Sequence, residues 1–503
     1  MQSLFLDTRV LDGIARERYG LTEEIMMENA ASALERAVMQ HLTATEKSGE
    51  RTVVILCGCG NNGADGYALA RRLVGQTLAD SVPLVPVVVA LAEPKSDLCR
   101  KQAARAEKCG VPRVGMDFAD DALFSRADII VDCVFGSGFH GDLDERTATV
   151  CARANAARAW RIACDVPTGL REDGTVAAGA FVADCTVTMG ALKLSLYSDA
   201  AKDGAGHIIC ENLGISRALF EAQNDGSFCA AATVLEAQDI ILPHRPKNAV
   251  NKGTFGHAAV ASGEKIGASC IAGAAALRFG AGLVSLVRLG QVFAKSDLPH
   301  VSPELMTASD IPANATALAF GMGLGRNAEA TQSYFDWLCA HPHIPCVVDA
   351  DAVYGAGIAS FLRSRAGGAV LTPHPKELQE LLRQCGLGDH TVAECVNDRP
   401  ALIEQFCRAF PDSVLLVKGA NPMIGHYDGS SFHLFVNPLG KNCLAKAGSG
   451  DVLAGLIVAL LAQGYAPLDA AIHGSLAHAL ASHRFTNDFS LTPLALIDAV
   501  AAL

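Results

Sequence analysis

The sequence has no apolar run near the roughly 18 residues that a membrane-spanning helix needs. It also lacks an excess of positive charge, because 41 Lys and Arg face 53 Asp and Glu, a formal net charge of −12. Proteins that hold nucleic acid or anionic membranes through their overall charge are basic. We therefore expect neither as a partner. An anionic ligand has to be held by local backbone N–H groups and a few lysines.

Signals for export and for structural zinc are lacking as well. The N-terminus carries Asp7 and Arg9 in its first turns and no apolar signal-peptide core. The 17 cysteines are odd in number and spread through the expected strands and helices, which is typical of reduced thiols in a cytoplasm. Cys57 and Cys59 form the one close pair, and no second pair or histidine cluster completes a zinc site. The expected location is cytoplasmic.

The length and composition favour a multidomain α/β protein. A chain of 503 residues is too long for one ordinary core, and half hydrophobic residues with 47 glycines suit an α/β fold with many tight turns. Residues 221–227 are small and polar and predict a linker. The predicted domains are 1–222 and 228–503.

In the N-terminal half, strands and helices alternate and predict an open parallel sheet. Strands are expected at 52–57, 84–90, 127–135, 160–164 and 186–189, and helices at 22–40, 67–74 and 96–109.

Polar and glycine-rich segments follow three of these strands. They are the loop 58–66, the segment 136–142 after Asp132, and the run from Asp165 to Thr168. Because the carboxyl ends of parallel strands share one edge, these oxygen ligands are expected to converge and to suit a hard cation. The alternative is that each Asp or Asn only forms a turn. Lys193, after a further strand, is a candidate proton carrier or an ordinary surface lysine.

These motifs resemble those of the NAD(P)H-hydrate epimerase family. That resemblance implies a Rossmann-like three-layer domain that interconverts the R and S epimers of hydrated NADH and NADPH. It implies K⁺ held by Asn62, Asp132 and Thr168, and proton transfer by Asp165 with Lys193. The residues implied to hold the hydrate are Asn61, Asn62, Gly63, Ala64, Asp65, Gly136, Ser137, Gly138, Phe139, His140, Gly141, Asp142 and Asp165.

Three residues depart from the usual family pattern. Ala64 stands where glycine is usual, and its Cβ would strain a backbone at positive φ. Thr168 replaces the commoner serine and keeps a hydroxyl, so ion binding is expected to survive. Met189 stands where phenylalanine is usual.

In the C-terminal half, a glycine-rich turn at 444–451 runs into an apolar helix without a charge from 452 to 462. Such a turn offers backbone N–H groups and the positive helix end to an anion. Asp451 is a negative charge where a phosphate would arrive, which suits a base for a hydroxyl that attacks a phosphoryl group. The alternative is a helix N-cap.

The remaining strands of this half again end in polar or glycine-rich clusters that should gather at one edge. His374 is held between two prolines, and His473, His478 and His483, spaced by five, cannot share a helix face and are expected to be structural. Strands are expected at 258–261, 283–287, 317–320, 346–349, 369–371 and 414–417, with clusters at 321–325, 349–352, 372–377 and 418–420.

This second set of motifs resembles the NAD(P)H-hydrate dehydratases, a ribokinase-like three-layer family. Its members phosphorylate the C6 hydroxyl of the hydrate with ADP or ATP, with Mg²⁺, and then eliminate phosphate. The resemblance implies that Asp451 is the base. Pro422 and residues 441–443 depart from the usual pattern of the family. The implied hydrate contacts are Ala268, Gly323, His374 and Asp451, and the implied nucleotide contacts are Lys418, Gly419, Ala420, Asn421, Pro422 and Gly450.

Together the two resemblances imply a bifunctional repair enzyme acting on hydrated NADH and NADPH (NADHX and NADPHX), a homo-oligomer, with ADP favoured over ATP as donor. Two alternatives stay open. One is a small-alcohol or vitamin kinase with a regulatory domain, which would release a stable phosphorylated product. The other is a nucleotide sensor, which would keep its function in Asp165→Asn and Asp451→Asn.

Overall fold

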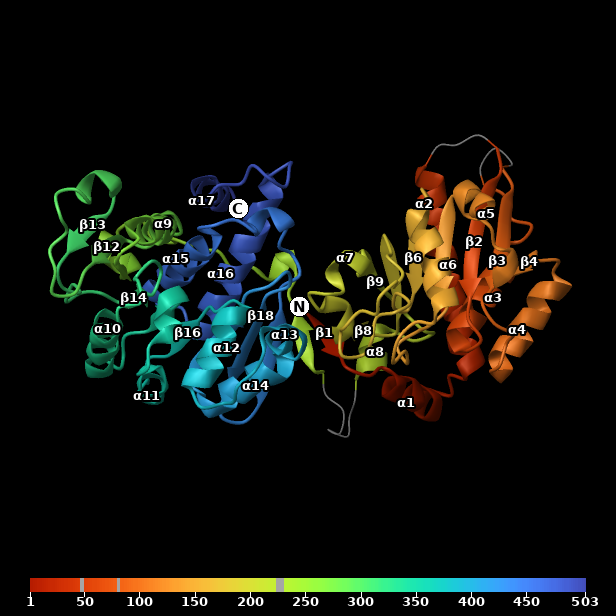
Figure 1. Ribbon diagram of the computed structural model, residues 1–503, viewed down its shortest axis with the longest axis horizontal. Helices are drawn as coiled ribbons and strands as arrows, with labels where there is room; N and C mark the ends of the chain where they lie inside the picture. Colours follow the sequence, from red (N-terminus) through yellow and green to blue (C-terminus); the bar gives the residue numbers. More distant parts are fainter. Residues whose placement is uncertain (46–48, 79–81, 223–229) are drawn as a thin grey trace. The chain divides into compact units, whose positions relative to one another are not determined.

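The computed structural model describes residues 1–45, 49–78, 82–222 and 230–503. The chain forms two compact units, one of Ser3–Ala231 and one of Met1–Gln2 with Ala232–Leu503 (Figure 1). Of the expected linker, residues 223–227 lie outside the described residues. We call the two parts the N-terminal unit and the C-terminal unit.

The N-terminal unit is built on a seven-stranded sheet in which every neighbouring pair is parallel. Its central strands are fully buried runs of aliphatic residues, as parallel strands covered on both faces require. The strands, in sheet order, are β4 (Arg113–Gly115), β3 (Leu84–Ala90), β2 (Arg51–Cys57), β5 (Ile129–Cys133), β6 (Trp160–Cys164), β7 (Cys185–Met189) and β9 (His207–Glu211).

Helices cover both faces of this sheet and enclose two separate apolar cores. One core lies under α2 (Glu23–Ala44), α3 (Asn61–Leu73) and α4 (Asp97–Lys108), and the other under α5 (Asp121–Arg126) and α6 (Glu145–Ala156). The predicted three-layer α/β class is therefore confirmed. The remaining elements are α1 (Arg9–Tyr19), α7 (Lys202–Ala205), α8 (Arg217–Glu221) and a short parallel pair of β1 (Gln2–Phe5) with β8 (Leu192–Lys193).

The turn after β2 differs from its prediction. Helix α3 begins at Asn61, so residues 61–66 are its first two turns and not a loop. The reversal is this tight because Gly63 lies against Gly58, where a Cβ would come within 2.0 Å of the Gly58 carbonyl oxygen. Ala64 has helical backbone and no positive φ, so the strain expected from its Cβ is absent.

The C-terminal unit contains a larger mixed sheet. The strands are parallel from β13 to β17, and β18 adds two antiparallel pairings at one side. In sheet order they are β13 (Met306–Ala308), β12 (Leu283–Val287), β11 (His257–Ala261), β14 (Ala317–Phe320), β15 (Cys346–Val348), β16 (Ala369–Leu371), β17 (Ser413–Val417), β18 (Met423–Tyr427), β19 (Phe432–Val436) and β10 (Ala232–Val234).

Helix α15 (Ser449–Ala462) is the centre of this unit, and its residues from Val452 to Ala462 are all buried. It packs between α9 (Ile266–Arg278), α16 (Pro467–Ala481) and α17 (Pro493–Val500) over one face of the sheet. Figure 1 shows the opposite face covered by α10 (Ala328–Ala340), α11 (Ile358–Arg363), α12 (Pro375–Gln384), α13 (Val392–Asn397) and α14 (Arg399–Ala409). The three-layer class is confirmed here too.

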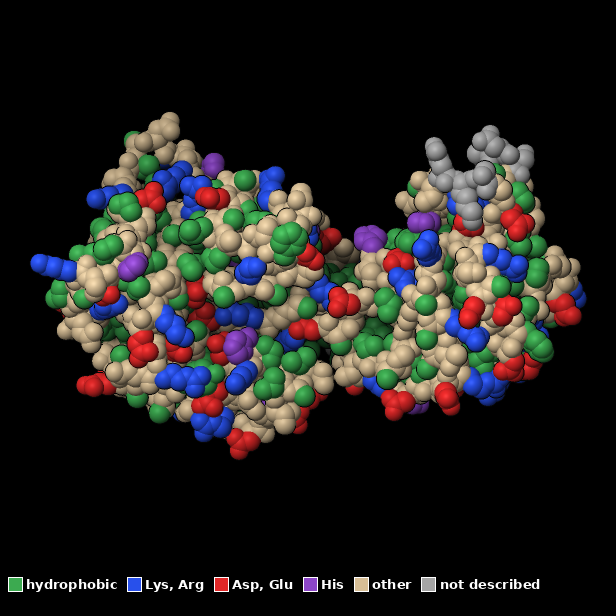
Figure 2. Space-filling view, turned by 45° about the horizontal axis from the view of Figure 1, so that its top comes forward, with side chains coloured by type: hydrophobic (Ala, Val, Ile, Leu, Met, Phe, Trp, Pro, Cys, Tyr) green, Lys and Arg blue, Asp and Glu red, His purple; other side chains and the backbone are tan. Residues whose placement is uncertain are grey.

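The helices and the surface bear on the expected partners. Among the helices of the described ranges, none joins the length to the apolar character that crossing a bilayer requires. On the face shown in Figure 2, Lys and Arg side chains are interspersed with Asp and Glu. That face presents no broad patch of positive charge.

Helix α15 approaches α9 so closely that Gly455 has no room for a side chain. A Cβ there would lie 2.3 Å from the Ala272 carbonyl oxygen. We expect Gly455→Ala to lower the free energy of unfolding of this unit by about 1–3 kcal/mol, because overpacking outweighs the gain in helix propensity. Thermal unfolding measures this. Gly267→Ala in α9, where a Cβ meets nothing within 4 Å, is the control and should not destabilise. An unchanged midpoint for Gly455→Ala would contradict the packing described.

Candidate active sites

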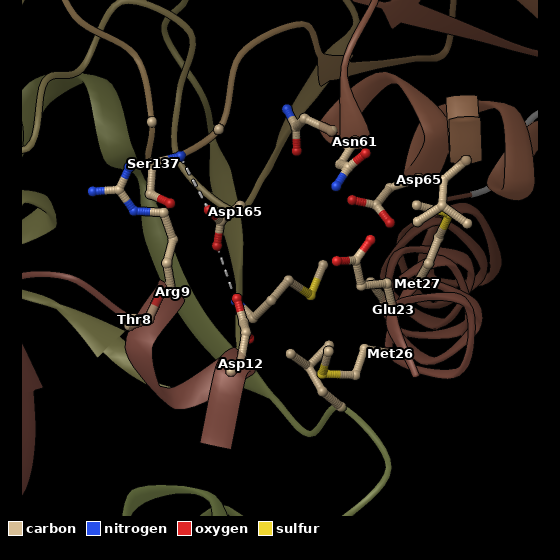
Figure 3. A pocket seen from close by; sticks show the side chains of 18 of the residues that line it. Thr8, Arg9, Asp12, Glu23, Met26, Met27, Asn61, Asp65, Ser137 and Asp165 are labelled. Carbon is tan, nitrogen blue, oxygen red and sulfur yellow. Dashed lines mark hydrogen bonds between the residues drawn. The ribbon is translucent and has the colours of Figure 1, made fainter. Parts of the chain in front are cut away.

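A cleft of about 450 Å³ opens in the N-terminal unit at the carboxyl ends of β2, β5 and β6 (Figure 3). Helices α1, α2 and the first turn of α3 form its walls. Its lining joins polar groups to the apolar side chains of Met26, Met27 and Met189. The other residues that line it are Thr8, Arg9, Asp12, Gly13, Arg16, Glu23, Ala30, Asn61, Asn62, Asp65, Leu98, Gly136, Ser137, Gly138, Asp165 and Leu213.

Asp165 is held at this cleft by backbone strain and by an ion pair. Its φ of 70° lies in the left-handed region, and the Val166 N–H donates to the Cys164 carbonyl across it, closing a tight three-residue turn. The Lys193 ammonium, 2% exposed, donates to Asp165 Oδ1 at 2.6 Å. The Ser137 N–H donates to Oδ2 at 3.3 Å. Asp165 is therefore fixed with its carboxylate facing the cleft.

Two further carboxyl groups face the cleft without a cation of their own. Burial raises the pKa of Asp12 to about 6, Lys193 opposes this rise, and Asp165 adds to it. Burial, with Asp165 and Asp12 nearby, raises the pKa of Asp65 well above its ordinary value. Below a pH of about 6 the cleft therefore combines an ion-paired carboxylate with carboxyl groups that retain protons.

Beneath the cleft, Asp132 is fully buried and its carboxylate is held by Thr168. The Thr168 hydroxyl and N–H each donate to it at 2.7 Å, and the Val134 N–H adds a third bond at 3.1 Å. Burial still raises the pKa of Asp132 to about 6.

The oxygen-rich character of this place fits the expected K⁺. The Asn62 amide nitrogen is buried and has no hydrogen-bond partner among the described residues. The amide oxygen lies next to Gly136, and turning the amide over would put the oxygen at the position of the nitrogen instead. A carboxylate without a cation, a hydroxyl and an amide oxygen are hard donors. K⁺ bound here would neutralise the charge of Asp132. The assignment of Asn62, Asp132 and Thr168 as its ligands stays a prediction.

The cleft gathers some of the predicted hydrate-binding residues and leaves others outside. Of the loop 136–142, the first three residues line it. Phe139 instead stacks on Phe135 at 5.1 Å between centroids, and Asp142 pairs with Arg171 on the surface. His140 Nδ1 lies 2.9 Å from the Gly138 carbonyl oxygen. Gly63 and Ala64 are buried in α3.

In the C-terminal unit, the segment 321–325 after β14 needs its glycines. Gly321, Gly323 and Gly325 have φ values of 112°, 61° and 85°. A Cβ on Gly323 would lie 2.9 Å from the Ala268 Cβ, so these two predicted hydrate contacts are neighbours. The Gly325 N–H donates to Asp351 at 3.0 Å. The segment is thereby fixed against the start of α9.

Lys418 lies among several carboxyl groups at the carboxyl edge of this sheet. It donates to Asp349 Oδ1 at 2.6 Å, and Asp349 is 2% exposed. A Cβ on Gly450 would lie 3.2 Å from the Lys418 ammonium, so the start of α15 adjoins it. Burial, with Asp349 nearby, raises the pKa of Asp451 to about 7 although Lys418 opposes the rise. Glu377 likewise has a raised pKa, from burial first.

Asp451 is the third residue of α15 and does not cap it, since Gly448 is the N-cap and has φ of 88°. Within the described part of the chain, no hydrogen bond or ion pair engages the Asp451 carboxyl. The alternative of a simple helix cap is therefore wrong, and the carboxyl is available to a ligand.

His374 has a structural role in this unit. It is the N-cap of α12, and its Nδ1 accepts from the Lys376 and Glu377 N–H groups at 3.2 Å each. Its ring is still 48% exposed, so a contact with the hydrate stays a prediction. His473, His478 and His483 each contact backbone atoms, as expected of structural residues.

The predicted nucleotide segment 418–422 follows β17 and lies next to this site. Gly419 and Ala420 are exposed, whereas Asn421 is buried and its carbonyl accepts from Arg399 at 3.1 Å. Pro422, which cannot donate an N–H, still accepts from the Asn437 N–H at 2.9 Å.

The carboxyl groups around Lys418 are suited to Mg²⁺ bound together with phosphate. Mg²⁺ usually takes one or two carboxylates plus substrate phosphates. In the described residues, no group of three or more His, Cys, Asp or Glu forms a metal cage by itself. Asp349, Glu377 and Asp451 share one lysine, so a divalent cation would balance their charge.

Reasoning from the sequence missed Asp12, Asp349 and Glu377 as site residues. The last two lie in segments recognised as polar clusters at strand ends, and their position there was a usable signal. Asp12 lies on a helix before the first predicted strand end, and no motif marks it.

The raised pKa of Asp451 gives a stability prediction. Its carboxyl binds a proton more tightly folded than unfolded, so the free energy of unfolding falls as pH rises from about 4 to about 7. Asp451→Asn removes this loss. We expect the substitution to stabilise the protein by about 2 kcal/mol at pH 8. A rise in pKa from 3.8 to about 7, at about 1.4 kcal/mol per pKa unit, sets an upper limit of about 4 kcal/mol, and the expected gain is smaller because the group is partly hydrated. At pH 4 the gain should vanish. Thermal midpoints of both proteins across this range measure it, and a gain independent of pH would contradict the assignment.

Family models match both halves of the chain. The family model described as NAD(P)H-hydrate dehydratase matches residues 259–501, and the model for the YjeF-related protein N-terminus matches 23–195. A Bacillus subtilis ADP/ATP-dependent NAD(P)H-hydrate dehydratase co-crystallized with ATP/Mg²⁺ is 24% identical, with a TM-score of 0.44, covering 53% of this chain and 94% of that one.

Two curated relatives match the chain over most of its length. The bifunctional NAD(P)H-hydrate repair enzyme Nnr of Helicobacter pylori is 40% identical over 507 residues, covering 100% of both chains. Its counterpart in Moorella thermoacetica is 32% identical, covering 94% of this chain and 90% of that one. With both halves matched in one chain, the protein belongs to the family of bifunctional NAD(P)H-hydrate repair enzymes.

Proposed function

We propose that this chain repairs hydrated NADH and NADPH in two steps. The N-terminal unit interconverts the R and S epimers, and the C-terminal unit returns the S epimer to the reduced nucleotide by phosphorylation and loss of phosphate. The observation that carries this proposal is Asp451, whose carboxyl no hydrogen bond or ion pair engages among the described residues. Its pKa of about 7 suits a base at neutral pH. It lies with Lys418 at the start of a helix.

In the C-terminal unit, each group has a distinct task. Asp451 takes the proton of the C6 hydroxyl as that oxygen attacks the terminal phosphate of the donor. Lys418 and the first N–H groups of α15 hold the phosphates. Mg²⁺, when bound with the nucleotide, neutralises charge on the transferred phosphoryl group. Once phosphorylated, the C6 oxygen leaves as phosphate, which is a far better leaving group than hydroxide. The adjacent ring carbon then loses a proton, and the ring double bond forms again.

In the N-terminal unit, the free N–H groups of Asn61, Asn62 and Gly63 at the start of α3 suit the pyrophosphate of the hydrate. The ring then lies toward Asp165 and the apolar wall of Met26 and Met27. Asp165, paired with Lys193, exchanges protons with the substrate. Asn62, Asp132 and Thr168 would hold K⁺, which would supply positive charge beside the cleft.

Three finer properties belong to the same proposal. ADP is the donor we favour, since the fused relatives from Helicobacter pylori and Moorella thermoacetica are bacterial. The unpaired thiols of the described cysteines support a reducing cytoplasm. Exposed apolar side chains such as Val292 (84%) and Phe489 (73%) support association of like chains.

Two substitutions should separate the activities. Asp451→Asn should lower dehydration of the S epimer by about 10²–10⁴-fold, because the base is lost, and leave epimerisation intact. Asp165→Asn should do the reverse. The assay incubates mixed epimers with ADP or ATP and Mg²⁺, and follows both epimers by chromatography and inorganic phosphate by colorimetry. A stable phosphorylated product, or no activity lost in either variant, would contradict the proposal.

The ion site predicts a dependence on K⁺ that one hydroxyl controls. Thr168→Val removes a K⁺ ligand and one of the hydrogen bonds to Asp132, whereas Thr168→Ser keeps both. We expect epimerisation to respond to K⁺ in the wild type and in Thr168→Ser, and to lose that response in Thr168→Val. Rates in K⁺ against equal ionic strength of tetramethylammonium measure it. Equal K⁺ response in all three proteins would exclude this residue as a ligand.

A further inference from the structure

Helix α1 supplies part of the substrate cleft although it lies before residues 23–195, the range that the family model matches. Arg9, Asp12, Gly13 and Arg16 recur at helical spacing, so one face of α1 lines the cleft. Figure 3 shows the Asp12 side chain extending from this helix toward Asp165, with Asp65 across the cleft.

The Asp12 carboxyl has no structural task that explains its burial. It is half-buried, and among the described residues no hydrogen bond or ion pair engages it. By contrast, Arg9 pairs with Asp7 and Arg16 pairs with Glu23. A carboxyl group withdrawn from water without a partner costs stability, and such groups gather at functional sites.

The charged groups that face Asp12 come from several elements. They are Lys193 of β8, Asp165 after β6, Asp7 before α1, Glu23 at the start of α2 and Asp65 of α3. Lys193 is already bound to Asp165, so the net surroundings of Asp12 favour its protonated form. Asp165 is therefore an ion-paired carboxylate, whereas the neighbouring Asp12 keeps its proton up to a pH of about 6.

Epimerisation of the hydrate requires this difference. Its C6 carries a hydroxyl next to the ring nitrogen, so inversion needs the hydroxyl to leave and water to return on the other face. Departure needs a proton on the oxygen, and return needs a base for the incoming water. Two carboxyl groups of opposite protonation state perform the same pair of tasks at an anomeric carbon in glycosidases.

Building on the proposed function, we propose that Asp12 is the proton donor of the epimerase cleft and Asp165 its base. Asp12 gives its proton to the C6 oxygen as the C6–O bond breaks, and the lone pair of the ring nitrogen forms a C=N bond. Water then adds to C6 from the other face, the C=N electron pair returns to nitrogen, and the water proton passes to Asp165. Proton exchange with solvent restores both groups.

Asp12→Asn tests this in the full chain, with rates corrected for spontaneous epimerisation. We expect epimerisation to fall by at least about a hundredfold. ADP-dependent dehydration of the S epimer by the same sample should not change, which serves as an internal control for folding and concentration. Glu17→Gln removes the same charge from an exposed position of α1 and should leave both activities unchanged.

The pH profile distinguishes proton donation from a structural role. Because the donor must be protonated, the wild-type epimerisation rate should fall as pH rises above the pKa of Asp12, about 6 in the free protein. Asp12→Glu should keep such a decline at a lower rate, and Asp12→Asn should lose it.

The outcomes separate this assignment from the proposed function. An active wild type with an equally active Asp12→Asn variant would overturn the role of Asp12 alone. So would a decline with pH that persists in Asp12→Asn and disappears in Asp65→Asn, since Asp65 would then be the donor. A wild type that does not epimerise the hydrate would overturn the proposed function and the assignment together.

Discussion

The two units rely on the same interaction, a lysine that neutralises one aspartate at the carboxyl end of a parallel strand. Lys193 binds Asp165 and Lys418 binds Asp349, each at 2.6 Å. A buried carboxylate without such a partner is costly, and each lysine serves one carboxylate while others lie nearby. The carboxyl groups that remain, Asp12 and Asp65 in one unit and Asp451 in the other, therefore keep their protons to higher pH.

Backbone strain is concentrated at the same places. Among the described residues, only Asp165 and Ala350 have positive φ without being glycine. Asp165 follows β6 and Ala350 follows Asp349 after β15, so both stand at a strand end that carries an ion-paired aspartate. Such conformations persist only where the surroundings impose them. Here hydrogen bonds to Asp165 and the ion pair of Asp349 hold the strained turns in place.

The sequence predicted the central parallel strands of both sheets because buried parallel strands are short aliphatic runs with few alternatives. It did not predict β4 and β9 of the N-terminal unit, or β10, β13, β18 and β19 of the C-terminal unit. It also located Asp165, Asp132 and Asp451, which follow such strands or open an apolar helix. The prediction of a loop at residues 61–66 was wrong. This segment is rich in turn-forming residues, yet it is helical because Gly63 packs closely on Gly58. Asp12 was beyond reach, since only tertiary packing brings α1 to the cleft.

The difference between the two sites follows from the thermodynamics of the two reactions. Epimers of one hydrate have similar free energies, so an exchange of protons between carboxyl groups is sufficient and no energy source is needed. Dehydration in water is opposed by the solvent, and a carboxyl group that only moves protons would catalyse the reverse reaction equally well. Coupling to a phosphoryl donor removes that symmetry, because the departing group is phosphate and not water. This explains why a lysine, a helix N-terminus and a free carboxyl adjoin at Asp451, whereas the N-terminal cleft combines several carboxyl groups with one ion pair.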